Sequence, residues 1–304
     1  MVPWPDMYRY FNGVGMWDRG VYIEKIVSGD VRFNFFDYDG FISLITNEYV
    51  WGWLENLVYH SDVLDVEDFL AVISALSLAS FSSALSKKGF FLLIPFLLNP
   101  LVIDLAYSQV RLSLAVSLIY WMYVFGVERL LYVVVVGIFV SMIHTAGLIF
   151  FSVYLLSLVS VKFRALGASS FEWRLFVLVG FGLFWGVIVG PLREFILSYI
   201  GDRRVVYSDM ASSYLYNSFW LFLFFVFLAN FRKIASFVEG RFSISILSAF
   251  VVLAVSGGYS LRFISASFPF ILISLFSVSK KCRWISVSCF VLYSLAQWYY
   301  YFFV

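Results

Sequence analysis

Two polar residues, Arg111 and His144, stand at the ends of apolar stretches of this sequence. Arg111 closes the segment Asp104-Leu-Ala-Tyr-Ser-Gln-Val-Arg111, and His144 ends the apolar run that begins after Arg129. A guanidinium group can hold phosphate oxygens, and a neutral imidazole can accept a proton from a hydroxyl group. A bilayer tolerates such residues only where they pair or meet water, so each is a candidate functional residue.

A structural role is the alternative for both residues. If residues 104–111 are helical, Asp104, Ser108 and Arg111 share one face of the helix. Asp104 and Arg111 would then form an ion pair, and His144 would bond to a neighbouring helix. The sequence leaves this alternative open.

The composition is that of a polytopic membrane protein, because 62% of the residues are hydrophobic and only 13% are charged. The high aromatic content, 22%, suits membrane interfaces and sugar-stacking surfaces equally. A net charge of only +2 argues against a nucleic-acid partner. Cys282 and Cys289 lie near one predicted helix and are interpreted as packing residues. The chain lacks a P-loop, a dinucleotide-binding glycine motif and paired metal-binding carboxylates, so we expect no cofactor and no metal.

The apolar segments predict an all-α fold with about ten transmembrane helices. The expected spans are 66–85, 89–106, 110–126, 129–143, 145–161, 173–192, 214–231, 242–257, 262–279 and 283–303. Asn99-Pro100 breaks the second span. His144-Thr-Ala-Gly147 is the natural break between the fourth and fifth spans; the alternative is one long tilted helix with His144 in mid-membrane.

The distribution of positive charge predicts the topology. Alternate loops carry the basic residues Lys87, Lys88, Arg129, Lys162, Arg164, Arg174, Arg232, Lys233, Arg241, Lys280, Lys281 and Arg283. Their acidic residues are only Glu128, Glu172 and Glu239. The positive-inside rule therefore makes these loops cytoplasmic. The Tyr107–Gln109 turn, the His144 break and the Gly257–Leu261 turn then lie outside.

The sequence predicts two parts. Residues 1–65 form an extracytoplasmic, acidic and aromatic-rich segment packed on the membrane face, with Trp51–Leu57 as an interfacial helix. Residues 66–304 form the multi-span transmembrane domain, with an outer loop at 191–213 that opens on a short amphipathic helix, Pro191–Ile200, ended by Gly201. Because an exported segment of this kind needs a preceding span, we expect a further helix upstream of Met1; export of the tail alone is the alternative.

Five arginines lie on the predicted outer side, where the topology rule disfavours them. They are Arg111, Arg193, Arg203, Arg204 and Arg262. Planar guanidinium groups match phosphate oxygens in a fork, so such a set suits a phosphorylated lipid head group. For Arg203 and Arg204 the alternative is surface pairing with the flanking Asp202 and Asp209.

Several short motifs resemble those of the EpsG-like, Wzy-type bacterial polysaccharide polymerases. Val110-Arg111-Leu-Ser-Leu-Ala115 is similar to that family's arginine motif, with Leu112 where the family often has glutamine. Val140-Ser-Met-Ile-His144-Thr-Ala-Gly-Leu148 is similar to its histidine motif, from which Ser141, Thr145 and Gly147 depart. The entry segment Pro5-Asp6-Met-Tyr8, the late Leu261-Arg262-Phe263 and the tyrosine-rich stretch 207–216 are also similar.

The resemblance implies a GT-C-like membrane glycosyltransferase in the bacterial inner membrane, with its active site facing the periplasm. It would move a glycan from undecaprenyl diphosphate onto a new lipid-linked repeat unit, with inversion and without a metal. A chain-length regulator and a flippase are candidate partners, besides the lipid bilayer. A flippase or exporter of lipid-linked oligosaccharide, or an O-antigen ligase, is the alternative.

The resemblance also suggests roles for individual residues. His144 is expected to act as the general base, with Glu48 or Asp6 in reserve, and Arg111 and Arg262 to bind the diphosphate with help from Arg193, Arg203 and Arg204. The expected sugar-binding residues are Asp6, Tyr8, Tyr107, Gln109, Tyr207 and Tyr214.

Overall fold

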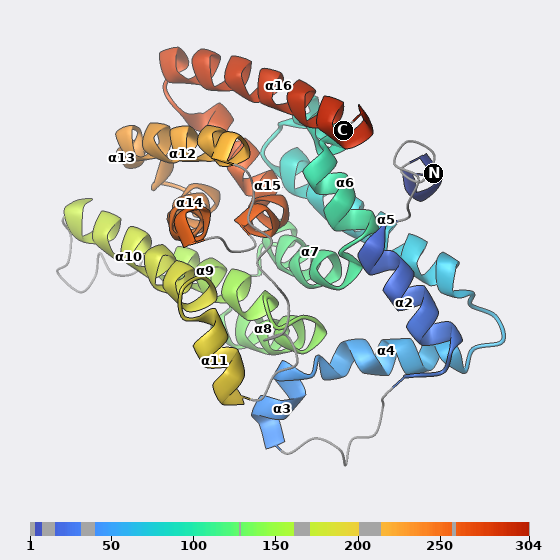
Figure 1. Ribbon diagram of the computed structural model, residues 1–304. Helices are drawn as coiled ribbons and strands as arrows, with labels where there is room; N and C mark the ends of the chain where they lie inside the picture. Colours follow the sequence, from blue (N-terminus) through green and yellow to red (C-terminus); the bar gives the residue numbers. More distant parts are fainter. Residues whose placement is uncertain are drawn as a thin grey trace. The chain divides into compact units, whose positions relative to one another are not determined.

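The computed structural model describes residues 4–7, 16–31, 40–127, 129–160, 171–200, 214–256 and 260–303. Every regular element in these ranges is a helix, which confirms the all-α class there (Figure 1). The chain forms two compact units, and each is described by itself. The first unit comprises residues 1–151 and 296–304, and the second comprises residues 152–295.

The first unit contains the helices that carry Arg111 and His144. They are α2 (Trp17–Val27), α3 (Gly40–Thr46), α4 (Tyr49–Tyr59), α5 (Val66–Lys87), η2 (Phe91–Leu98), α6 (Pro100–Tyr107), α7 (Val110–Val124), α8 (Leu130–Ile143) and the beginning of α9 (Gly147–Val159). Helix α7 packs between α5 and α8, α2 contacts α4 and α5, and α4 also contacts α8. The amino-terminal helices therefore belong to the same compact unit as the first apolar helices, a division different from the predicted one at residue 65.

The second predicted span, 89–106, is two short helices rather than one. Pro95 lies inside the 3₁₀ helix η2, and a new helix begins at Pro100, where the Asn99 side chain accepts a hydrogen bond from the Leu101 amide at 3.0 Å. The Asn99-Pro100 break is thus confirmed. A second break at Ser108 and Gln109 bends α6 from α7 by 104°. The break agrees with the predicted turn at Tyr107–Gln109, and Asp104 and Arg111 therefore do not share one continuous helix.

The predicted break at His144 is confirmed, and the alternative of one long helix is wrong. Helix α8 ends at Ile143, His144 is extended with φ −150° and ψ 127°, and α9 begins at Gly147. The two helices pack closely because Gly137 has no side chain. A Cβ atom there would lie 2.2 Å from the Phe151 ring. The tight hairpin holds His144 at its tip.

The second unit contains the remaining helices. They are the end of α9, α10 (Phe171–Val189), α11 (Arg193–Ile200), α12 (Tyr214–Ala229), α13 (Phe231–Ile234), α14 (Val238–Ser256), α15 (Ser260–Ser277) and α16 (Lys280–Phe303), whose last residues belong to the first unit. Helices α10 and α14 approach closely because Cβ atoms at Gly182 and Gly186 would collide with backbone oxygens of α14. Small residues at four-residue spacing are typical of helix packing in membranes.

The helices are those of a membrane-embedded protein. In the part that the structure describes, α5, Glu172–Val189 of α10 and α14 are long and apolar enough to cross a membrane, and the bent pair α6 and α7 would be a fourth crossing. Shorter apolar helices lie at Leu130–Ile143, Gly147–Val159, Asn217–Ala229 and Leu261–Ser277. A helix therefore occurs in each predicted span, but three or four of them have the length and apolar character of a crossing.

Candidate functional site

The candidate site is built around Glu48, in the turn between α3 and α4. Glu48 has φ 55° and ψ 51°, and within the described ranges it alone among residues other than glycine has a positive φ. The left-handed conformation costs an ordinary residue roughly 1–2 kcal/mol, so contacts around the turn must hold it. Only 7% of Glu48 is exposed, which makes its carboxylate a buried charge that needs partners.

The carboxylate of Glu48 has partners on α7 and in the break between α8 and α9. Its Oε2 atom pairs with Nη1 of Arg111, and its Oε1 atom bonds Nδ1 of His144. The Thr145 amide also donates to Oε1 at 3.3 Å. The Thr145 hydroxyl donates to the Ile45 carbonyl at 3.3 Å, so the turn between α3 and α4 is fastened to the break between α8 and α9.

His144 is oriented by this contact. Because a carboxylate can only accept, the bond to Glu48 is made by an Nδ1–H donor, and in the neutral imidazole Nε2 then carries a lone pair. Within the described part of the chain Nε2 bonds to no other residue, and 16% of the side chain is exposed. This atom can therefore accept a proton from a bound hydroxyl group.

Arg111, in the first turn of α7, has two of its three guanidinium nitrogens occupied. Nε donates to the Tyr22 hydroxyl at 3.0 Å, and Nη1 donates to Glu48. Nη2 bonds to no residue among those described, and 27% of the side chain is exposed. The positive end of α7 lies beside it, which favours a negative ligand there.

The alternative of an Asp104–Arg111 pair is wrong, because Arg111 bonds to Glu48 and Tyr22 instead. The bend after α6 separates the two residues, and the Gln109 amide donates to Oδ2 of Asp104 at 2.6 Å. The Nε–H and one Nη1–H are engaged, so the second Nη1–H and both N–H groups of Nη2 are left for a ligand. The fork through Nε and Nη2 is therefore closed while Tyr22 accepts from Nε.

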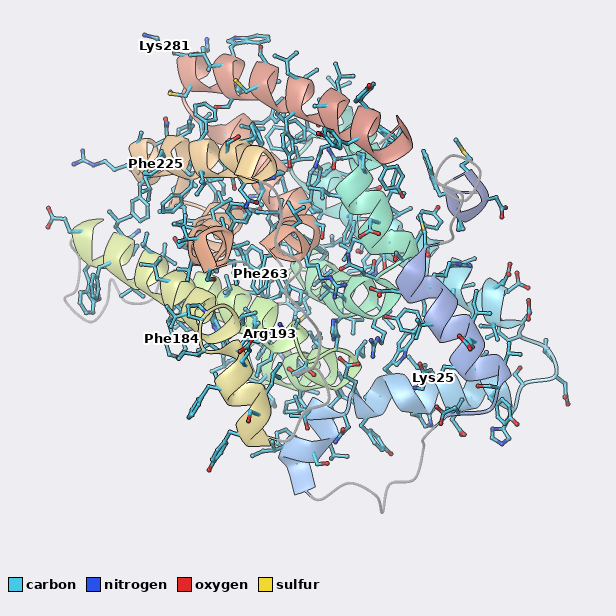
Figure 2. All side chains as sticks on the ribbon, in the orientation of Figure 1. Lys25, Phe184, Arg193, Phe225, Phe263 and Lys281 are labelled. Carbon is cyan, nitrogen blue, oxygen red and sulfur yellow. The ribbon has the colours of Figure 1, made fainter. Side chains whose placement is uncertain are left out.

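Helices α2 and α4 support Arg111 through a second set of contacts. Trp51 packs edge-on against Tyr22 with 5.6 Å between ring centroids, and its Nε1–H donates to Glu55 at 2.5 Å. Glu55, 1% exposed, pairs with Lys25 of α2, which Figure 2 labels. Burial raises the pKa of Tyr22 to about 12, against the opposing effect of Arg111, so its hydroxyl stays neutral.

Three of the predicted sugar-binding residues are described in the first unit. Tyr107 is buried in a cluster with Met16, Ile103 and Ala106, so its ring has no free face for stacking. The Gln109 amide bonds Asp104, and Asp6 is exposed in the short helical segment at residues 4–7. Among the described residues, none of these three side chains bonds to Glu48, Arg111 or His144.

The remaining predicted residues lie elsewhere. Arg193 begins α11 and Arg262 lies in α15, both in the second unit. Tyr8, Arg203, Arg204 and Tyr207 lie outside the described residues, as does the side chain of Tyr214. The site therefore rests on Glu48, Arg111 and His144, three of the predicted residues, together with Tyr22, which sequence reasoning did not single out.

No family model, no curated protein and no solved structure matches this chain. The described residues also contain no group of three histidine, cysteine, aspartate or glutamate side chains that could hold a metal ion. One carboxylate holds a proton acceptor and a cation side by side, which suits a reaction that deprotonates one group while negative charge develops on another.

Proposed function

We propose that this protein is a polysaccharide polymerase, a membrane glycosyltransferase that uses undecaprenyl-diphosphate-linked glycans. The observation that carries the proposal is the shared carboxylate of Glu48, which holds His144 and Arg111 together while leaving Nε2 and Nη2 available. The order of these residues along the chain and the resemblance of their flanking motifs to the EpsG-like polymerases support it.

The proposed reaction is a single displacement. Nε2 of His144 takes the proton of the acceptor sugar hydroxyl, and the hydroxyl oxygen attacks the anomeric carbon of the donor glycan. The bond from that carbon to the diphosphate oxygen breaks, and the lipid diphosphate leaves with the electron pair. Arg111 meets the negative charge that grows on the leaving group, so it stabilises the transition state more than the ground state.

Glu48 acts through both partners rather than as the base itself. Its carboxylate fixes the ring of His144 and stabilises the imidazolium that forms when the proton arrives, as the carboxylate of a catalytic triad does. Glu48 already accepts from Arg111, His144 and Thr145, so a role as the acceptor of the hydroxyl proton is less favourable.

The number of membrane crossings and the orientation of the chain are part of the same proposal. We infer about ten crossings, with the basic loops in the cytoplasm and the Glu48 site on the opposite side of the bacterial inner membrane. In that arrangement the short apolar helices cross as broken or tilted segments whose backbone ends are satisfied by neighbouring helices. The lipid-linked substrate would reach the site from the outer leaflet.

The proposal is tested by adding the purified protein to purified lipid-linked repeat units and measuring chain length on a gel. Polymer of many units is expected, and none is expected from the His144→Ala variant. A strain lacking the protein should retain single repeat units on its surface glycan but lose long chains. Complete loss of transferred units from that strain, with no polymer in the purified assay, would instead favour a flippase or a ligase.

A further inference from the structure

Tyr22 lies against the guanidinium of Arg111 from a helix that sequence reasoning gave no catalytic role. Tyr22 is 5% exposed, its hydroxyl accepts from Nε at 3.0 Å, and its ring centroid lies 4.9 Å from the guanidinium carbon. Tyr22 and Ile26 are both buried on α2, and their spacing of four residues turns them toward the same side of the helix. The packing of α2 therefore fixes where the Tyr22 hydroxyl lies.

Tyr22 is held in turn by a closed ring of contacts between α2 and α4. Trp51 packs edge-on against Tyr22 and donates to Glu55, and Glu55 pairs with Lys25, one helical turn after Tyr22. Trp51 is 1% exposed and also packs against Phe69 of α5 at 5.9 Å. These contacts join α2 to α4 at two points, through Tyr22 with Trp51 and through Lys25 with Glu55, so the phenol has little freedom to turn away from Arg111.

The contacts divide the guanidinium into engaged and open parts. The Tyr22 hydroxyl bonds Nε, the Tyr22 ring centroid lies 4.9 Å from the guanidinium carbon, and Glu48 takes one N–H of Nη1. The part left for a ligand is therefore the edge that carries Nη2, with the second N–H of Nη1. A guanidinium without these contacts would present several donor edges, and a phosphate could then bind through two nitrogens in more than one orientation.

We infer that Tyr22 is a positioning residue, which directs Nη2 of Arg111 toward one oxygen of the leaving diphosphate. This inference rests on the proposed polymerase function. The bond to Tyr22 stops Arg111 from gripping the bound diphosphate through both Nε and Nη2, a grip that would hold substrate and transition state equally. Tyr22 thereby favours a contact between Arg111 and the leaving oxygen that is stronger in the transition state, where negative charge develops on that oxygen.

The neutrality of the phenol suits this role. Since burial raises the pKa of Tyr22 to about 12, the group accepts from Arg111 without bringing a negative charge to it. Glu48 is then the carboxylate in direct contact with Arg111, and a second anion at Nε would weaken the attraction for a diphosphate. A carboxylate in place of the phenol would orient Arg111 equally well, but its negative charge would offset the positive charge that Arg111 offers to a diphosphate.

The test is Tyr22→Phe, which keeps the ring on the guanidinium and removes only the hydroxyl. We expect kcat with lipid-linked repeat units to fall about tenfold, the usual effect of losing one hydrogen bond to a charged group, while KM for the donor stays within about threefold or decreases. The pH dependence of kcat/KM should keep its shape, because Glu48 and His144 are unchanged. Tyr59→Phe is the matched control, on an exposed tyrosine at the end of α4, and should behave as the parent protein.

Glu55→Gln is the second variant, chosen in case Tyr22→Phe does not accumulate in membranes. It keeps a hydrogen-bond acceptor for Trp51 and removes the ion pair with Lys25, so kcat should fall by a smaller factor, again without a rise in KM. A rise in donor KM with unchanged kcat in either variant, or full activity in both, would overturn the inference and leave the polymerase proposal standing. If the parent protein makes no polymer in the same assay, the proposed function fails and this inference fails with it.

Discussion

Glu48 and His144 are 96 residues apart in the sequence, and a carboxylate oxygen of the first bonds Nδ1 of the second. The contact joins an amino-terminal turn, where Glu48 adopts a left-handed backbone, to the extended residue at the tip of the α8–α9 hairpin. The backbone conformation of Glu48 is not favoured locally, since an ordinary residue avoids positive φ. The contact with His144 helps to stabilise this conformation. Because the contact engages Nδ1 of His144, it leaves Nε2 available.

Glu48→Gln should distinguish two effects of Glu48, the orientation of the His144 ring and the negative charge beside it. Glutamine preserves the shape of the side chain and a carbonyl that can still accept from Nδ1 of His144, but it removes the negative charge that stabilises the imidazolium. We expect kcat for polymer formation to fall roughly 10²-fold with the protein still folded. Glu24→Gln, on an exposed carboxylate of α2, is the control. Near-parent turnover of Glu48→Gln would mean that the carboxylate only packs the turn.

Arg111→Met should destabilise the protein more than most surface changes. It leaves the buried carboxylate of Glu48 without its cation, a loss of about 2–4 kcal/mol in the free energy of unfolding. The double variant Arg111→Met with Glu48→Gln should recover most of that loss, because no unpaired charge then remains. Thermal unfolding of the detergent-solubilised proteins measures both effects. Equal losses in the single and double variants would show that the ion pair is not what stabilises this region.

The helices and their breaks were readable from the sequence because their signals are local. Asn99-Pro100 ends one helix and begins another, and the polar His144-Thr-Ala-Gly147 interrupts an apolar run, as the structure has them. The break at Ser108 and Gln109 also falls in the predicted Tyr107–Gln109 turn, but the size of its bend, 104°, was not readable, since neither proline nor glycine marks it. A face shared by Asp104 and Arg111 was considered only for a continuous helix over residues 104–111, and the bend rules that helix out.

The site was readable only in part. Arg111 and His144 were predicted because polar residues at the ends of apolar segments are costly. Glu48 was named as a reserve base among many acidic residues, and its role as a shared partner depends on contacts 63 and 96 residues away. Tyr22 gave no signal, because a buried aromatic residue on an amphipathic helix is ordinary and its hydroxyl bond to Arg111 spans 89 residues.

Gly137→Ala should loosen the α8–α9 hairpin that carries His144. The added methyl group would lie 2.2 Å from the Phe151 ring, so the helices must move apart or the ring must turn. We expect a net loss of about 1–3 kcal/mol in stability, despite the better helix propensity of alanine. Gly180→Ala is the control, since a Cβ atom there meets no other atom within 4 Å. A Gly137 variant as stable as the control would indicate that the two helices are less tightly packed than described.

The proposed membrane orientation predicts a labelling pattern. Cys282 and Cys289 are free and must first be replaced by serine. In that background, Asp62→Cys should react with a membrane-impermeant thiol reagent in intact spheroplasts, and Lys280→Cys should react only after the membrane is opened. Both positions are exposed in the structure, so a lack of reaction reflects the membrane rather than burial. The reverse pattern would place the Glu48 site on the cytoplasmic side and remove the proposed access from the outer leaflet.

His144→Gln and His144→Ala together test the proton transfer. Glutamine can donate to Glu48 as the imidazole does, so the turn should stay fastened to the α8–α9 break, but an amide cannot take the proton of a sugar hydroxyl at neutral pH. Both variants should therefore retain binding of the lipid-linked donor while transfer slows by roughly 10²–10⁴-fold, the usual effect of losing a general base. Alanine should in addition lower stability, because Glu48 loses a partner, and glutamine should not. The measurements are polymer formation at saturating substrate, donor binding to the purified protein and thermal unfolding. If His144→Gln makes polymer at nearly the parent rate, His144 is a structural partner of Glu48, and the base must be sought elsewhere, with Glu48 and Asp6 as the remaining candidates from the sequence.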